Sequence, residues 1–270
     1  MIAVANGRRR GIMGAPMNLS SFGRIGSIGL VCLALASGSP AAASCSNASL
    51  NGVYGLLSGG FDGSGMPEDA LLQITADGSG NITAGSATQS DNGSVDSFTF
   101  TGTYSITKTC TGALILRDSG GTNHYNIVLD PINKQFRFIQ TDSGRVASGT
   151  GVAEGAVVCT TTGGKPETFA STLTGTVLVT GTPLPAAAMG RIVRDGSGGA
   201  SSVTTVDVDG TISILKSKGT YTTNSNCTGT SQFTDSGGTT HYATILVDGG
   251  DEILSLGTDA QSVVSGTAQR

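Results

Sequence analysis

Short segments with alternating apolar and polar side chains make up most of the chain after residue 43. Between 95 and 106, Phe98 and Phe100 fall on one face, together with Tyr104, and Thr99 and Thr101 fall on the other. Period-two alternation is typical of a β-strand that has one buried and one solvated face. The first half of the chain predicts eight such strands, at about 50–60, 68–77, 81–90, 95–106, 111–118, 122–130, 135–141 and 146–154. No helical pattern is present in this region.

Tight turns separate the predicted strands. They carry residue pairs that tolerate positive φ and favour hairpins: Asp77-Gly78, Asn92-Gly93, Gly120-Gly121 and Asp209-Gly210. Asp-Gly-Ser-Gly occurs at 62–65, 77–80 and 195–198. These tetrads lack the closely spaced carboxylates of a calcium loop, so we interpret them as hairpin turns.

The second half of the chain repeats the first at an offset of 117 residues. Gly102-Thr103-Tyr104 matches 219–221, and Cys110-Thr111-Gly112 matches 227–229. Further matches pair 118–122 with 235–239, 124–125 with 241–242, 141–142 with 258–259, and 148–150 with 265–267. The period is too long for a solenoid repeat and has the size of a domain. The sequence therefore predicts a tandem duplication.

Eight strands joined by short turns, within about 110 residues, predict an all-β, antiparallel, up-and-down barrel in each half. Closure would remove the exposed strand edges. Two β-sandwiches are the alternative. We assign the barrels to 44–155 and 156–270. The alternation fails near Ile212, Ile214 and Leu215, where a β-bulge is one explanation.

Residues 1–43 have the features of a signal peptide. Arg8, Arg9 and Arg10 are basic, 28–36 is a short apolar run, and 41–43 are the small residues that signal peptidase prefers. We expect cleavage after residue 43 and an exported protein. A minor alternative is a lipoprotein that is acylated at Cys45.

Four cysteines remain after residue 43: Cys45, Cys110, Cys159 and Cys227. An even number in an exported chain indicates disulfides. Each half can form one bond by itself, and the duplication favours this arrangement, so we expect Cys45–Cys110 and Cys159–Cys227.

The succession G-x-Y, C-T-G, His, T-D and S-G-T in both halves resembles a group of uncharacterised exported bacterial proteins. Their architecture is similar to calycin and allene-oxide-cyclase-type barrels. The resemblance implies the fold and export, and it implies no activity.

Composition limits the function classes. Only 13% of residues are charged, the formal net charge is −4, and no basic stripe is present, which argues against a nucleic-acid partner. No C-x-x-C, G-x-S-x-G or phosphate loop is present. We expect no metal, no cofactor and no transmembrane span.

The candidate ligand-binding residues are His124, Tyr125, His241 and Tyr242, which form matching pairs in the two halves. The alternative is that both histidines are structural, and we interpret Asp118, Asp142, Asp235 and Asp259 as turn or strand-end residues.

The expected function is non-catalytic binding, with a small apolar ligand in a barrel lumen or an interaction at the surface. Two rival functions are a cyclase or isomerase that uses the lumen, and a structural envelope or matrix protein. An open apolar cavity that contains His124 favours ligand binding or catalysis, whereas a lumen filled by Phe98, Phe100, Phe136 and Phe138 favours the structural role.

Overall fold

A computed structural model describes residues 44–156, 158–161, 164–179 and 181–270. From residue 44 onward they belong to one compact unit. The predicted signal peptide lies outside the described residues. Two short 3-10 turns, η1 (Asn47–Ser49) and η2 (Asp248–Gly250), accompany the strands.

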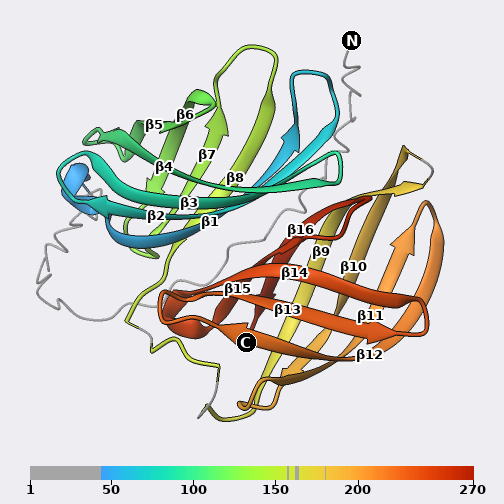
Figure 1. Ribbon diagram of the computed structural model, residues 1–270. Helices are drawn as coiled ribbons and strands as arrows, with labels where there is room; N and C mark the ends of the chain where they lie inside the picture. Colours follow the sequence, from blue (N-terminus) through green and yellow to red (C-terminus); the bar gives the residue numbers. More distant parts are fainter. Residues whose placement is uncertain (1–43, 157, 162–163, 180) are drawn as a thin grey trace, which may run out of the picture. The chain divides into compact units, whose positions relative to one another are not determined.

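The first eight strands close into an antiparallel barrel in which each strand pairs with its neighbours in sequence (Figure 1). Pairing of β1 with β8 completes the ring, from Tyr54↔Ala153 to Phe61↔Val146. The strands are β1 (Asn51–Phe61), β2 (Pro67–Asp77), β3 (Asn81–Asp91), β4 (Ser94–Ile106), β5 (Thr111–Asp118), β6 (Gly121–Asp130), β7 (Gln135–Gln140) and β8 (Val146–Ala153). The barrel prediction is confirmed, and the sandwich alternative is wrong because no strand edge is left open.

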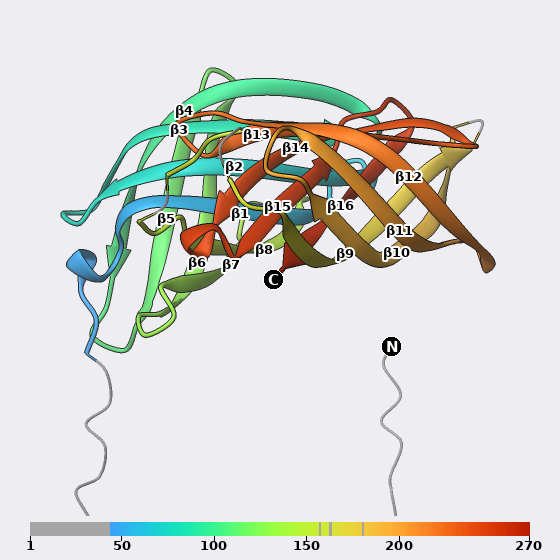
Figure 2. The same ribbon diagram turned by 90° about the horizontal axis from the view of Figure 1, so that it is seen from below.

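The next eight strands close in the same way, and β16 pairs with β9 (Figure 2). They are β9 (Glu167–Val179), β10 (Thr182–Arg194), β11 (Gly199–Val208), β12 (Thr211–Thr223), β13 (Thr228–Asp235), β14 (Gly238–Val247), β15 (Glu252–Gly257) and β16 (Ser262–Gln269). The hairpins β9–β10, β11–β12, β13–β14 and β15–β16 lie at one end of this barrel, and the disulfide lies at the other.

The alternation of β4 has the predicted effect. Phe100 and Tyr104 are buried, Phe98 packs against the same core, and Thr99 and Thr101 are exposed. The bulge suggested near 212–218 is wrong, since β11 and β12 pair there without a register shift. Ile212 and Ile214 simply point outward and are exposed. Register shifts occur instead in the first barrel, between Thr75 and Ala76 where β2 pairs with β3, and between Ile82 and Gly85 where β3 pairs with β4.

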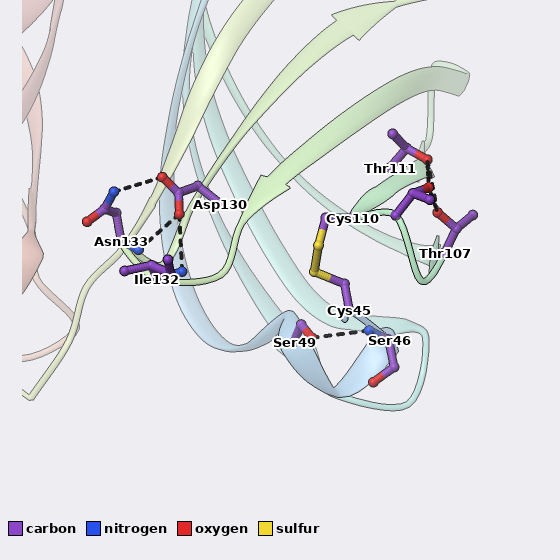
Figure 3. Close-up of a disulfide and its surroundings, with 10 residues drawn as sticks. Cys45, Ser46, Ser49, Thr107, Cys110, Thr111, Asp130, Ile132 and Asn133 are labelled. Atoms are coloured by element: carbon purple, nitrogen blue, oxygen red, sulfur yellow. Dashed lines mark hydrogen bonds between the residues drawn. A yellow bond between two sulfur atoms is a disulfide. The ribbon is translucent and has the colours of Figure 1, made fainter. Parts of the chain in front are cut away.

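One disulfide anchors each barrel. Cys45 bonds to Cys110 (Figure 3), and Cys159 bonds to Cys227. The Cα–Cα distance is 5.0 Å in both. These are the pairs that the repeat predicts. Cys110 and Cys227 have φ of 62° and 65°, which is unfavourable for a residue other than glycine. The turn holds them there, because each carbonyl accepts a hydrogen bond from Leu129 or Leu246.

The bond at Cys45 bears on export. Its sulfur is joined to the sulfur of Cys110, so this disulfide and a lipidated Cys45 exclude one another.

Candidate functional site

Aromatic rings fill the lumen of the first barrel. Phe136 and Phe138 on β7 and Phe100 on β4 belong to its main core. Each ring lies over a glycine: a Cβ at Gly85 would stand 2.2 Å from Phe100, and one at Gly149 would stand 2.4 Å from Phe138. Close contact of this kind leaves a cavity of only about 50 Å³.

The second barrel has serine at several positions where the first barrel has a large apolar side chain in its core. With the 117-residue offset, Ser217 replaces Phe100, Ser255 replaces Phe138, and Ser231 replaces Leu114. Ser171 likewise takes the place of Leu56. Leu56 pairs with Gly151 where the first barrel closes, and Ser171 pairs with Ala268, the equivalent of Gly151, where the second barrel closes. The result is a cavity of about 240 Å³ in the lumen.

The cavity wall combines apolar side chains with hydroxyl groups. Apolar atoms make up most of its surface. The apolar lining includes Leu173, Val177, Ile192, Val206, Leu215 and Phe233, and the hydroxyls include those of Ser171, Ser202, Thr204, Ser217, Ser231 and Ser255. Pockets of this composition bind apolar molecules and orient them with a few polar groups.

A buried arginine underlies the cavity at the disulfide end of the barrel. The guanidinium carbon of Arg194 lies 4.4 Å from the ring centroid of Tyr221 and 5.8 Å from that of Phe169. Burial lowers the pKa of Arg194, although an arginine remains protonated in a protein. The two rings take up the cationic group by cation–π interaction, and Arg194 is not among the residues that line the cavity. The repeat has Ala76 at this place in the first barrel.

An ion pair narrows the mouth of the first barrel but not that of the second. Arg145 Nη1 lies 3.5 Å from Glu68 Oε1, and both residues line the small first cavity. Burial raises the pKa of Glu68, and the positive charge of Arg145 opposes that shift. In the second barrel, Ser262 takes the place of Arg145 and Ala186 takes the place of Glu68, and both line the larger cavity. Shorter, uncharged side chains therefore leave the second mouth wider.

A His–Asp pair clamps a strand end in each barrel. The backbone N–H of His124 donates to Asp142 Oδ2 over 2.8 Å, and its Nδ1 lies 2.7 Å from Oδ1. His241 and Asp259 form the same contacts, both of 2.7 Å. In the first barrel, desolvation raises the pKa of Asp142, but the hydrogen bonds from His124 and Gln140, together with the charge of His124, outweigh it and lower the pKa. Since the pair occurs equally in the filled barrel, its geometry alone does not mark a reactive site.

Carboxylates and a phenol surround the mouth of the second cavity. Ser217 Oγ donates to Asp235 Oδ2 over 3.3 Å, while Oδ1 accepts from the backbone N–H of Gly237 over 2.7 Å. Burial raises the pKa of Tyr242, and the negative charges of Asp259 and Asp235 add to that increase. Tyr242 therefore presents a neutral phenol to the lumen at physiological pH.

The structure distributes the four proposed ligand-binding residues unevenly. His241 and Tyr242 line the 240 Å³ cavity, Tyr125 lines the 50 Å³ cavity, and His124 lines neither. In the first barrel, burial raises the pKa of Tyr125 to about 12. The luminal serines were not predicted, although aligning the two repeats position by position reveals each change from a large apolar residue to serine.

Metal-binding clusters and membrane-spanning helices are both absent from the residues that the structure describes. Among them, no three His, Cys, Asp or Glu side chains gather in a way that could hold a metal ion. Within the same residues, no helix has the length and apolar character needed to cross a membrane.

Comparison with known proteins assigns no family to this chain. No protein-family model matches the sequence, and no curated protein matches it significantly. Among solved structures, the chain is similar to the isotype 1 transferrin binding protein B from serogroup B Neisseria meningitidis. The TM-score is 0.34 and the identity 7%, over 82% of this chain and 75% of that chain. A likeness this weak carries no argument about function.

Proposed function

We propose that the protein is an exported, non-catalytic binding protein that holds a small apolar ligand in the lumen of its second barrel. The observation that supports this is the 240 Å³ cavity, which lies where the first barrel is filled by phenylalanine. The first barrel then acts as a packed scaffold. Export fits the two disulfides, since such bonds persist in oxidising compartments.

The size of the cavity restricts the ligand. An apolar cavity of about 150 Å³ is enough for benzene, and sites for drug-sized molecules measure about 300–1,000 Å³. A volume of about 240 Å³ lies between the two. The expected ligand therefore has about the size of a bicyclic hydrocarbon that carries one small polar group.

The charges around the cavity favour a neutral or cationic ligand. Its lining contains Asp235 and Asp259 but no lysine or arginine, and Asp259 is already paired with His241. An anion would enter against the charge of Asp235 and find no cation on the wall. The luminal hydroxyls can accept or donate a hydrogen bond to an alcohol, amine or carbonyl group.

Three probes with one skeleton test the proposal: 1-naphthalenemethanol, 1-naphthylmethylamine and 1-naphthoate. We expect saturable binding of the alcohol and the amine at one site, followed by naphthalene fluorescence. Binding of the naphthoate should be at least about tenfold weaker, which corresponds to about 1.4 kcal/mol. Asp235→Asn should weaken binding of the amine, because it removes a negative charge from the cavity wall, and it should leave the affinity for the alcohol unchanged. If none of the three binds, the proposed function is wrong.

A further inference from the structure

The contact between the two barrels joins faces that are not equivalent in the repeat. The first barrel contributes the outer side of β1 and β2, including Leu57 and Leu71, which we name face A. The second contributes the outer side of β14 and β15, which we name face B and which carries Ile245, Val247, Leu254 and Leu256. The packing is tight, because a Cβ at Gly55 on face A would lie 2.7 Å from Val247 Cγ1.

Hydrogen bonds outside the apolar cluster hold the same two barrels together. Ser90 Oγ donates to the carbonyl of Ser262 over 3.0 Å, and the backbone N–H of Gly249 donates to the carbonyl of Glu154 over 2.8 Å. Because the two barrels are repeats, each has both a face A and a face B. The contact buries face A of the first barrel and face B of the second, so face B of the first barrel and face A of the second do not take part in it.

The second barrel's own face A is exposed but only partly apolar, because Thr172 stands where the first barrel has Leu57. Strand pairing places Met189 on β10 where Leu71 lies on β2. Leu71 is 4% exposed within the contact, whereas Met189 is 65% exposed. Val203 and Ile214 extend the same outer surface across β11 and β12, and both are exposed. These residues form an apolar strip of the kind that marks an interaction surface.

The first barrel's own face B is also exposed. Val128 and Ile139 occupy the places of Ile245 and Leu256, and they are 56% and 53% exposed against 3% and 0%. Asp130 and Arg137 stand at the places of Val247 and Leu254. The free face B is thus less apolar than the buried one, and a contact through it should be weaker than the contact within the chain.

We propose that the free face A of one molecule packs against the free face B of a second copy of the chain. The contact would use the same two surfaces of the fold as the internal one, with Met189 as the apolar residue of face A and Val128 and Ile139 as those of face B. Because the two faces differ, the association is head-to-tail and leaves a free face at each end. Weak, concentration-dependent chains of molecules follow from this geometry.

Sedimentation velocity over a range of protein concentrations tests the proposal. The weight-average sedimentation coefficient of the protein should rise with concentration. Met189→Glu and Ile139→Glu should each abolish the rise, because each introduces a charge into one of the two faces. Val158→Glu is the control: Val158 is 88% exposed in the segment between β8 and β9 and belongs to neither face, so its substitution should leave association intact. Unchanged thermal unfolding verifies that the variants are folded.

A mixture of the two variants distinguishes head-to-tail packing from every symmetric alternative. Met189→Glu keeps an intact face B, and Ile139→Glu keeps an intact face A. Their equimolar mixture should therefore form dimers but nothing longer. A monomer at all concentrations, or a mixture that stays monomeric while the unaltered protein associates, would overturn the proposal. Co-sedimentation with phosphatidylglycerol vesicles that is lost in Met189→Glu and kept in Ile139→Glu would instead assign face A to an anionic membrane, near Arg191 and Lys216.

Discussion

Ser255 in the second barrel stands where Phe138 stands in the first, and each faces an equivalent glycine on the neighbouring strand. Phe138 pairs with Gly149, and Ser255 pairs with Gly266. The second barrel has therefore kept the glycine that accommodates a ring but has lost the ring. This single relationship connects the repeat in the sequence to the cavity on which the proposed function depends.

The His–Asp pairs should contribute equally to the stability of both barrels. His124→Gln and His241→Gln should each lower the free energy of unfolding by about 0.5–1 kcal/mol, because a half-exposed hydrogen-bonded pair is weakened by solvent. Urea unfolding measures this. Probe binding should persist in both variants, and a His241→Gln protein of normal stability that no longer binds would give the histidine a functional role.

Asp77 should make the first barrel sensitive to acid. Hydrogen bonds from the Asn81 side chain, the Asn81 backbone and the Ser79 backbone lower the pKa of Asp77 to about 2. A carboxyl group with a depressed folded-state pKa stabilises the protein above its unfolded value, about 3.9, and loses that effect as the pH falls toward 2.

Comparison of the protein with Asp77→Asn tests this pH dependence. The variant should unfold more easily at pH 6, and the difference should shrink as the pH falls from about 4 through 2. Asp195 has the same place in the second barrel and also a lowered pKa, mainly through the backbone N–H of Ser197, so Asp195→Asn should behave alike. A difference that is constant with pH would contradict this assignment.

Each disulfide should stabilise its own barrel to a similar extent. The bonds close loops of 65 and 68 residues. By the loop-entropy estimate, loops of this length stabilise by about 4 kcal/mol. Cys45→Ala/Cys110→Ala and Cys159→Ala/Cys227→Ala should therefore lower the midpoint of denaturant unfolding by comparable amounts. A loss confined to one variant would show that the two barrels depend on their bonds differently.

The fold followed from the sequence because local signals and the repeat agreed. Alternation along 95–106 placed Phe100 inward and Thr99 outward, and the Asp-Gly-Ser-Gly tetrads are turns in which Asp77 or Asp195 accepts backbone hydrogen bonds. Local signals alone do not specify barrel closure, because it depends on pairing between β1 and β8, which are far apart in sequence.

The site was harder to predict than the fold. Matching residues drew attention to His124 and His241, whereas the cavity arises from positions at which the halves differ, such as Ser217 in place of Phe100. The burial of Arg194 between Tyr221 and Phe169 also depends on which residues meet across a closed barrel. The boundaries of 44–155 and 156–270 as independent folding units stay a prediction.

The cavity predicts that a ring restored at one position will eliminate binding. Ser255→Phe returns the residue of the first barrel to a place where the partner, Gly266, is already glycine. By contrast, Ser217→Phe would meet Ser202, which stands where the first barrel has Gly85. Ser255→Phe is therefore the cleaner substitution. Ser201→Phe is its matched control, because Ser201 lies on the exposed outer side of β11.

Isothermal titration of these two variants and the unaltered protein with 1-naphthalenemethanol tests whether the lumen of the second barrel is the ligand site. Ser255→Phe should fold with equal or greater thermal stability and bind the alcohol at least about tenfold more weakly, while Ser201→Phe should bind it normally. A folded Ser255→Phe protein that binds the alcohol as tightly as the unaltered protein would contradict a ligand site in the lumen of the second barrel.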